Sequence, residues 1–285
     1  MNPLQIIWNI DPEIFRIGGF SLRYYSVLFA ISFLVGYGLM KRMFKKEGQD
    51  EQLLTPLLIY IIAGTIIGAR LGQVFFYEFE YYKNHPFEII FPFRIGETGF
   101  EWTGYQGLAS HGGAIGILVA LALYCRKYKQ ELLFTLDKLV IAVALAGFLI
   151  RLGNFFNSEI IGSPTDLPWS VVFAAVDPIP RHPAQLYEAT AYLLVFIITW
   201  NLYQRKMMPL KKGSLFGWFL ILVFSARFFI EFAKENQKAF EETLPINMGQ
   251  ILSIPFVLIG LYFVMGKRKD PANQISPTKS KHDGT

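Results

Sequence analysis

Residues 139–162 read LVIAVALAGFLIRLGNFFNSEIIG, and the first eleven of them are apolar enough to belong to a membrane-spanning helix. The run then meets Arg151, two asparagines, Glu159 and two glycines, where a spanning helix would ordinarily continue or end in a simple turn. An ionisable side chain at the centre of a bilayer is unfavourable by about 2.5 kcal/mol or more on insertion scales. These polar residues therefore need a partner or a function.

The rest of the chain has the composition of a membrane protein. Its 285 residues are 53% hydrophobic, 16% aromatic and only 17% charged, and the mean hydropathy is positive. Apolar windows long enough to cross a hydrocarbon core recur along the whole length. They lie near residues 22–40, 53–77, 108–124, 133–152, 185–203, 215–232 and 248–265. The sequence predicts an all-α fold, a polytopic membrane helical bundle with about seven transmembrane helices.

Basic residues follow alternate windows. The clusters are KRMFKK after the first, RKYK after the third, QRKMMPLKK after the fifth and GKRK after the seventh. Because short cytoplasmic connections are enriched in Lys and Arg, we expect a periplasmic N-terminus and a cytoplasmic C-terminus. The same clusters account for the net charge of +5 through attraction to anionic membrane lipids. Nucleic-acid binding is therefore not expected.

No composition break divides the chain into soluble domains. We expect one integral-membrane domain, residues 1–269, and a disordered cytoplasmic tail, residues 270–285, which is polar and lacks apolar periodicity. Turn-forming residues predict two irregular periplasmic connections, 78–107 and 153–184, and the aromatic first one suits short helices at the membrane interface. The lone Cys125 is expected to be an apolar filler. We expect neither a metal nor a cofactor, since paired-cysteine motifs are missing from the sequence.

Ionisable residues inside the spans fall at one depth. At 1.5 Å of rise per residue, alternating helices bring five of them close to the outer leaflet: Arg70, His111, Arg151, Arg227 and Glu231. Each has an ordinary explanation alone, such as an arginine that reaches for the headgroups or an ion pair between Arg227 and Glu231 four residues later. Their convergence favours a shared pocket.

The polar residue types favour an anionic ligand. Arginine binds phosphate oxygens bidentately, and the Asn154 amide is either a further donor or a helix-terminal cap. Gly112 and Gly113, beside His111, and Gly162 each have two possible roles. They either allow close helix packing or let the backbone come close to a ligand. We expect a pocket for the head group of an anionic lipid that enters sideways from the bilayer.

The motif from Arg151 to Gly162 resembles the G-R-x-G-N-F-x-N-x-E-x-x-G pattern of the prolipoprotein diacylglyceryl transferases of bacterial inner membranes, with Ile150 in place of the first glycine. Further blocks resemble that family in the same order. They are DPEIF (11–15), RYY (23–25), GARLG (68–72), SHGG (110–113), RHPAQLYE (181–188), ARFFIEF (226–232) and MGQILSIP (248–255). The resemblance therefore covers residues 11–255.

The resemblance implies transfer of a diacylglyceryl group from phosphatidylglycerol to the lipobox cysteine of an exported prolipoprotein, with release of glycerol phosphate. Arg151 and Arg227 suit stabilisation of the departing phosphate, and His111 is the best-placed base for the attacking thiol. Arg70 is expected to have a structural role rather than a catalytic one. The resemblance also places Tyr25, Asn154 and Gly162 among the required residues and makes Glu231 an orienter of Arg227.

Two rival functions use the same residues. A transporter or channel for an anionic solute would also carry arginines in its spans, but it needs polar groups at the midplane and the inner leaflet. Most of these spans are apolar in their inner halves, apart from Asp137 and Lys138 near the cytosolic end. A lipid-binding scaffold without catalysis would keep the arginines and have no use for His111.

Overall fold

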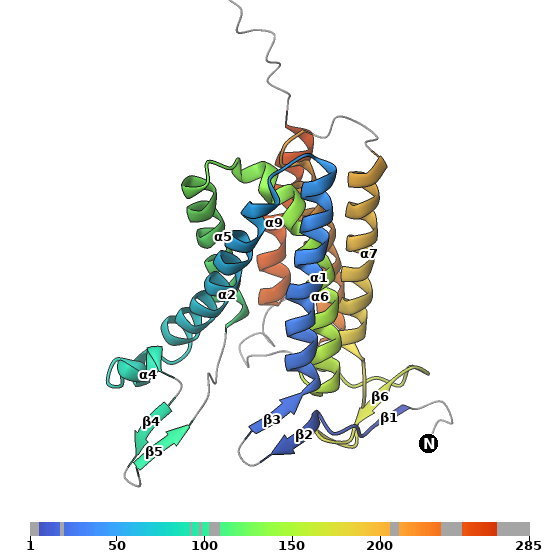
Figure 1. Ribbon diagram of the computed structural model, residues 1–285. Coiled ribbons are helices and arrows are strands. Elements are labelled where there is room, and N and C mark those ends of the chain that lie inside the picture. Colours follow the sequence, from blue (N-terminus) through green and yellow to red (C-terminus); the bar gives the residue numbers. More distant parts are fainter. Residues whose placement is uncertain are drawn as a thin grey trace, which may run out of the picture.

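The computed structural model describes residues 6–17, 20–91, 93–96, 99–102, 109–205, 211–234 and 247–266, and the predicted tail 270–285 lies outside them. Long helices dominate these residues (Figure 1). They are α1 (Tyr24–Lys46), α2 (Leu54–Phe76), α5 (Ser110–Lys127), α6 (Leu132–Phe156), α7 (Ala184–Arg205), α8 (Ser214–Ile230) and α9 (Met248–Met265). Each one coincides with a predicted window, so the expected helical bundle is confirmed.

Six of the long helices in the described part of the chain are long and apolar enough to cross a membrane; α5 does not meet the same measure. The chain is a multi-pass membrane protein. Local signals fix several helix starts: Asn247 and Gln250 form a reciprocal capping box at α9. The Asp137 carboxylate of α6 accepts hydrogen bonds from the backbone N–H groups of Gly213 and Phe216, at 2.7 and 2.8 Å, at the start of α8.

Consecutive long helices run in opposite directions, which gives the bundle two distinct ends. The strand end carries the strands and two short helices (Figure 1): β1 (Ile6–Trp8), β2 (Glu13–Ile17), β3 (Phe20–Arg23), α3 (Phe79–Tyr82), α4 (Phe87–Ile90), β4 (Phe93–Gly96), β5 (Gly99–Trp102), β6 (Val171–Phe173) and β7 (Pro180–Arg181). The basic end carries Lys45, Lys46, Arg126, Lys127, Lys211 and Lys212. The 3₁₀ turns η1 (Glu51–Leu53) and η2 (Glu231–Ala233) flank α2 and α8.

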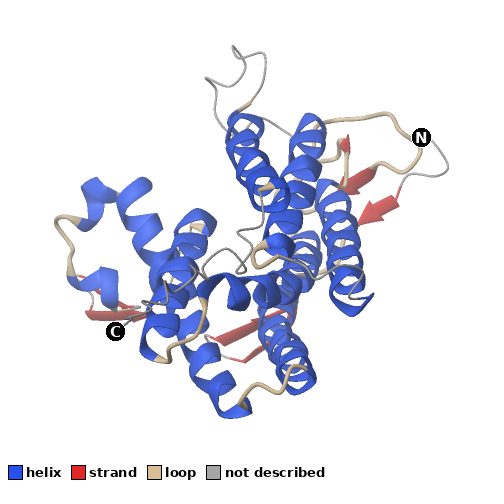
Figure 2. Cartoon of the chain, turned by 90° about the horizontal axis from the view of Figure 1, so that it is seen from above, coloured by secondary structure: helices blue, strands red, loops and turns tan. Residues whose placement is uncertain are grey.

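The strands were not expected from the sequence. They form two antiparallel hairpins, β2–β3 and β4–β5, and one three-stranded sheet in which β6 pairs in parallel with β1 and antiparallel with β7. Figure 2 shows them in separate places around the helices. The prediction of two irregular connections was therefore wrong for parts of both, although the short helices α3 and α4 occur where interfacial helices were expected. Strands of two to five residues are too short for a period-two pattern to be recognised.

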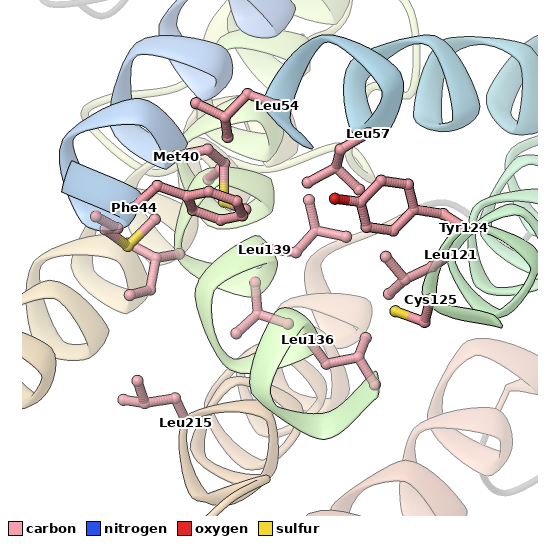
Figure 3. Close-up of a cluster of buried hydrophobic side chains, with 14 residues drawn as sticks. Met40, Phe44, Leu54, Leu57, Leu121, Tyr124, Cys125, Leu136, Leu139 and Leu215 are labelled. Carbon is pink, nitrogen blue, oxygen red and sulfur yellow. The ribbon is translucent and has the colours of Figure 1, made fainter. Parts of the chain in front are cut away.

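An apolar core closes the basic end of the bundle. Figure 3 shows side chains of α1, α2, α5, α6 and α8 meeting there, among them Met40, Leu57, Tyr124 and Leu139. Cys125 belongs to this cluster and is 5% exposed, with its sulfur 3.8 Å from the Thr135 hydroxyl. The expectation that the cysteine is a buried filler is met by this packing.

Helices α2 and α5 form a hairpin with its own tight seam. Three glycines of α2, Gly64, Gly68 and Gly72, face Gly112 and Gly116 of α5, and a Cβ atom on Gly116 would come within 2.0 Å of the Gly64 carbonyl oxygen. Small residues let two membrane helices approach through their backbones. The hairpin packs mainly on itself, and α2 leans away from α1 towards the strand end (Figure 1).

The glycine seam predicts that two glycine-to-alanine substitutions at different positions have opposite effects on stability. Gly116→Ala should lower the free energy of unfolding by about 1–3 kcal/mol, because its methyl group overlaps the backbone of α2. Gly38→Ala, on α1, meets nothing within 4 Å and should raise stability by up to about 1 kcal/mol through helix propensity. Thermal unfolding of both variants in the same detergent measures the difference; equal midpoints would contradict the seam.

Candidate functional site

Four of the five intramembrane ionisable residues lie in the half of their helices nearer the strand end, and the fifth, Glu231, directly follows α8 at the same end. Arg70 is near the end of α2, His111 is in the first turn of α5, and Arg151 is near the end of α6. Arg227 is in the last turn of α8, which Glu231 follows directly. The predicted common depth therefore agrees with the helix bounds and directions.

Glu188 of α7 occupies the centre of the site. Its side chain is 1% exposed, and its two carboxylate oxygens lie 2.9 Å from Arg151 Nε and 2.8 Å from Lys234 Nζ. Neither contact has the alignment of a hydrogen bond, so the attraction is mainly between charges. A buried carboxylate is tolerated when cations compensate it. Glu188 thereby joins α6 and α7 to the segment after α8.

Lys234 also binds Glu231, with 3.2 Å between Nζ and Oε2. We name Arg151, Glu188, Glu231 and Lys234 the charge cluster. The expected pair of Arg227 with Glu231 is not formed: among the described residues the ionic partner of Glu231 is Lys234. The physical reason is that α8 ends at Ile230 and tightens into the 3₁₀ turn η2, which changes the direction of the Glu231 side chain.

Arg227 faces a small cavity between α7 and α8. The wall combines Glu188, Tyr192 and Arg227 with apolar side chains that include Val195, Val223 and Ile230. The described part of the chain offers no carboxylate within ion-pair distance of this half-buried guanidinium. Arg227 is thus the cation beside the charge cluster that retains its capacity for an anion.

Asn154 connects Arg151 to the loop after α6. Its side-chain oxygen accepts a hydrogen bond from Arg151 Nη1 at 3.3 Å, and its amide nitrogen donates to Glu159 Oε2 at 3.2 Å. Asn154 lies within the last turn of α6, so the alternative of a terminal cap is not realised. Ser158 and Ile160 both have positive φ, 52° and 56°. Such backbone costs about 1–3 kcal/mol per residue, and it turns Glu159 back towards Asn154.

Gly162 lies at a crossing of three backbone segments. A Cβ atom there would be 2.5 Å from the His182 Cβ and 2.6 Å from the Ala233 carbonyl oxygen, so any larger residue would separate them. The Gly162 carbonyl accepts a hydrogen bond from Arg181 Nη1 at 3.2 Å. Arg181 also binds Asp177, outside the helices, and this contact holds the pKa of the Asp177 carboxyl below its usual range.

One more expected site residue, Tyr25, stands beside the charge cluster. Gly153 permits the approach of Tyr25, since a Cβ atom on it would be 2.8 Å from the tyrosine ring. Tyr25 is close enough to Glu159 and Arg151 to interact with their charges. Gln185 donates a hydrogen bond of 2.6 Å to the Glu159 carbonyl and thereby supports the neighbouring loop.

Arg70 has a different environment. Its guanidinium donates to the backbone carbonyls of Glu88 and Ile89, at the end of α4, and lies 4.8 Å from the Tyr82 ring centroid. Arg70 is 6% exposed. It therefore secures the loop beyond α2, which agrees with the structural part expected for it.

His111 and its glycines belong to the α2–α5 hairpin. The His111 side chain is exposed, and its contacts among the described residues include no hydrogen bond. Gly112 meets the backbone of Gly68 and Gly72, while Gly113 lies in ordinary contact with Ala69. The glycines thus serve close packing; their approach to a ligand stays a prediction.

Sequence reasoning missed the part of Lys234 and undervalued that of Glu188. From the sequence no role was assigned to Lys234, although its spacing of three residues from Glu231 was a usable signal for contact. Glu188 was recognised only as the last residue of the RHPAQLYE block, 181–188. Within the described ranges no group of three metal-ligating side chains occurs.

The charge cluster predicts a large difference between two Glu→Gln variants. Glu188→Gln leaves Arg151 without its buried carboxylate and Lys234 with Glu231 alone, and we expect it to lower the free energy of unfolding by about 3 kcal/mol or more. In Glu131→Gln the lost partner is Lys212, whose side chain is 61% exposed, so the loss should stay below about 1 kcal/mol. Thermal unfolding in detergent compares them, and equal losses would contradict the central position of Glu188.

Comparison with known proteins identifies relatives over nearly the whole chain. The model of the family described as prolipoprotein diacylglyceryl transferase matches residues 12–266. Three proteins named phosphatidylglycerol–prolipoprotein diacylglyceryl transferase are each 46% identical to the chain. They come from Bacteroides fragilis (93% of this chain, 97% of the relative), Tolumonas auensis (94% and 100%) and Chloroherpeton thalassium (91% and 93%). The chain belongs to the prolipoprotein diacylglyceryl transferase family.

Proposed function

We propose that this protein transfers the diacylglyceryl group of phosphatidylglycerol to the thiol of a prolipoprotein, the first step of lipoprotein maturation. The acceptor is the lipobox cysteine beside the signal peptide of an exported prolipoprotein, and the second product is glycerol phosphate. The names of its relatives contain both substrates. The proposed location is the bacterial inner (cytoplasmic) membrane.

The observation that carries this proposal is the environment of Arg227. The Arg227 side chain lines a small cavity with an apolar surface, within a membrane-spanning bundle, and the described residues provide no carboxylate within ion-pair distance of its guanidinium. A lipid phosphodiester supplies the missing negative charge, and the acyl chains suit the apolar surroundings. Arg151 contacts Glu188, and Glu188 lines the same cavity as Arg227, so both arginines have Glu188 as a neighbour.

The reaction needs stabilisation of negative charge on a leaving phosphate. The thiolate sulfur attacks the glycerol carbon that bears the phosphate; a carbon–sulfur bond forms, and the bond from carbon to phosphate oxygen breaks with its electron pair leaving on the oxygen. Preorganised guanidinium groups in a water-poor site stabilise that developing charge. Arg227 and Arg151 have this role in the proposal.

Other residues hold these groups in place. Asn154 fixes the Arg151 guanidinium and retains donor capacity for a phosphate or a glycerol hydroxyl, and Tyr25 stands beside them. Gly162 lets its own segment pass close to His182 and Ala233. This close crossing brings Lys234 Nζ within 2.8 Å of the Glu188 carboxylate. Glu231 orients the cluster through Lys234. Arg70, Gly112 and Gly113 shape the neighbouring hairpin.

His111 is the proposed proton acceptor for the thiol. A thiol with a pKa near 8.5 is mostly protonated at neutral pH, so a base increases the reactive fraction. Its exposed side chain, in the first turn of α5, is accessible to a substrate that arrives beside the hairpin. His111 thus belongs to the α2–α5 hairpin, whereas the phosphate-binding Arg151 and Arg227 belong to α6 and α8.

The polar residues at the basic end bind other parts of the protein, and this argues against the alternative of a transporter. Asp137 caps α8, and Lys138 forms an ion pair of 2.9 Å with Glu47. Both are engaged in contacts between structural elements. A solute pathway requires polar groups available along the whole depth of the membrane.

The strand end is proposed to face the periplasm. The basic end carries three pairs of adjacent basic residues, Lys45–Lys46, Arg126–Lys127 and Lys211–Lys212, and such clusters favour the cytoplasmic side. The charge cluster and His111 would then lie near the periplasmic leaflet, where exported prolipoproteins emerge.

A direct assay tests the reaction. Purified protein is incubated with phosphatidylglycerol vesicles and a lipobox peptide, and the peptide is weighed by mass spectrometry. We expect a mass increase equal to one diacylglyceryl group, and no increase with phosphatidylethanolamine vesicles or with a peptide whose cysteine is replaced by serine. A folded, monodisperse preparation that leaves the peptide mass unchanged would contradict the proposal.

His111→Gln separates the enzyme from a lipid-binding scaffold. We expect lipidation at pH 7 to fall about 100-fold or more and to recover partly at pH 9, where more of the thiol is ionised without a base. Phosphatidylglycerol binding should be retained. His85→Gln, the same change on an exposed histidine that stacks on Tyr81, serves as the control and should keep full activity. Unchanged turnover in His111→Gln would remove the base assignment.

Cys125→Ser tests whether the substrate thiol attacks directly. Cys125 is buried in the core at the basic end, away from the charge cluster, so it is not available as a nucleophile. Lipidation should stay within about twofold of the unsubstituted protein, and Cys125→Ala should behave in the same way. Near-complete loss of lipidation in both folded variants would instead indicate a covalent intermediate on the enzyme.

A further inference from the structure

The MGQ sequence at the start of α9, residues 248–250, has no part in the reaction described above. Gln250 is 2% exposed, and its side chain bonds in two directions. The oxygen accepts from the Asn247 N–H at 3.0 Å, and the amide nitrogen donates to the Phe228 carbonyl at 3.3 Å. The first bond completes the capping box of α9. The second one fixes the start of α9 against the end of α8.

The carbonyl that Gln250 binds lies where α8 ends. The Glu231 N–H donates to the Arg227 carbonyl, and the chain then tightens into the 3₁₀ turn η2. Because the last carbonyls of an α-helix have no partner within the helix, they need donors from elsewhere. Gln250 supplies one for Phe228, so the first turn of α9 stabilises the end of α8 one residue after Arg227.

Gly249 leaves the space beside which the Glu231 carboxylate lies. A Cβ atom on Gly249 would be 2.6 Å from Glu231 Cδ, 2.8 Å from Oε1 and 2.9 Å from Oε2. Glu231 is 8% exposed, and its carboxylate is at the first turn of α9, where the helix dipole favours a negative charge. From this position Oε2 lies 3.2 Å from Lys234 Nζ.

Arg227 is the alternative partner of Glu231. The two residues are four apart in the sequence, a spacing at which opposite charges on a helix attract each other. Among the described residues, however, the ionic partner of Glu231 is Lys234. A carboxylate on Arg227 would neutralise the guanidinium and occupy the donors that a phosphate needs. The direction of the Glu231 side chain therefore decides whether Arg227 is available for an anion.

We propose that Gly249 is a positioning residue that keeps Arg227 available for the lipid phosphate. Its lack of a side chain lets the Glu231 carboxylate turn to α9 and Lys234, away from the arginine. This inference rests on the proposed function, because phosphate binding by Arg227 belongs to that proposal. The atoms that a methyl group on Gly249 would meet are at the end of the flexible Glu231 side chain. A larger residue at 249 therefore moves the carboxylate and leaves the helices in place.

Gly249→Ala tests the inference through the Kd for phosphatidylglycerol, measured without turnover by native mass spectrometry. We expect the Kd to rise about 10-fold or more, the scale of one charge-assisted hydrogen bond. The unfolding midpoint should not change, because Glu231 exchanges one cation for another and Lys234 keeps Glu188. Gly38→Ala, the same change in open space on α1, is the matched control and should keep the original Kd.

Two results with Gly249→Ala would each overturn the inference. One is a Kd within about twofold of the unsubstituted protein, which is less than the loss of one such hydrogen bond produces. The other is a lowered unfolding midpoint, which would show that the methyl group displaces a helix and not the Glu231 side chain.

The background of Glu231→Gln separates charge from shape. Glutamine has nearly the shape of glutamate, so its overlap with the new methyl group remains, but it has no charge to place on Arg227. Gly249→Ala should therefore change the Kd by less than about threefold in this background. An equal rise in both backgrounds would indicate a steric effect and overturn the inference. Failure of the unsubstituted protein to lipidate the peptide would instead reject the proposed function.

Discussion

The buried carboxylate of Glu188 is the constraint on which the rest of the site depends. It compensates Arg151 and Lys234 at 2.9 and 2.8 Å inside a bundle where an uncompensated charge is strongly unfavourable. Because these three residues come from α6, α7 and the segment after η2, their attraction determines how those elements meet at the strand end. Arg227 is then the cation that remains available beside them.

This arrangement separates two tasks that arginine performs in a membrane protein. Arg70 directs its donors to backbone carbonyls and its face to Tyr82, so it secures a loop. Arg227 has polar and apolar neighbours around a cavity and, among the described residues, no carboxylate within ion-pair distance. The residue type and the depth are the same, and the difference lies in what surrounds each guanidinium group.

The sequence predicts the long helices well because an apolar run of this length has few other structures available to it. It predicts the depth of Arg151 and Arg227 for the same reason, since helical rise is fixed. It does not predict that Glu231 turns to Lys234, because α8 changes to a 3₁₀ turn after Ile230 and the Glu231 carboxyl packs against Gly249 of α9, a contact between segments that are not adjacent in the chain. The parallel pairing of Ile6–Trp8 with Val171–Phe173 is equally invisible, since it joins segments that are distant in the chain.

The contact of Lys234 with Glu188 also has a consequence for biogenesis. A chain inserted from its N-terminus delivers α6 with Arg151 first and α7 with Glu188 next, while Lys234 follows only after α8. Until that last cation arrives, Arg151 is the only one of the two cations that Glu188 can bind. The assembled site therefore cannot precede insertion of α8, and a nascent chain stalled before this point would hold Glu188 with Arg151 as its single counter-ion and without the link to the segment after η2.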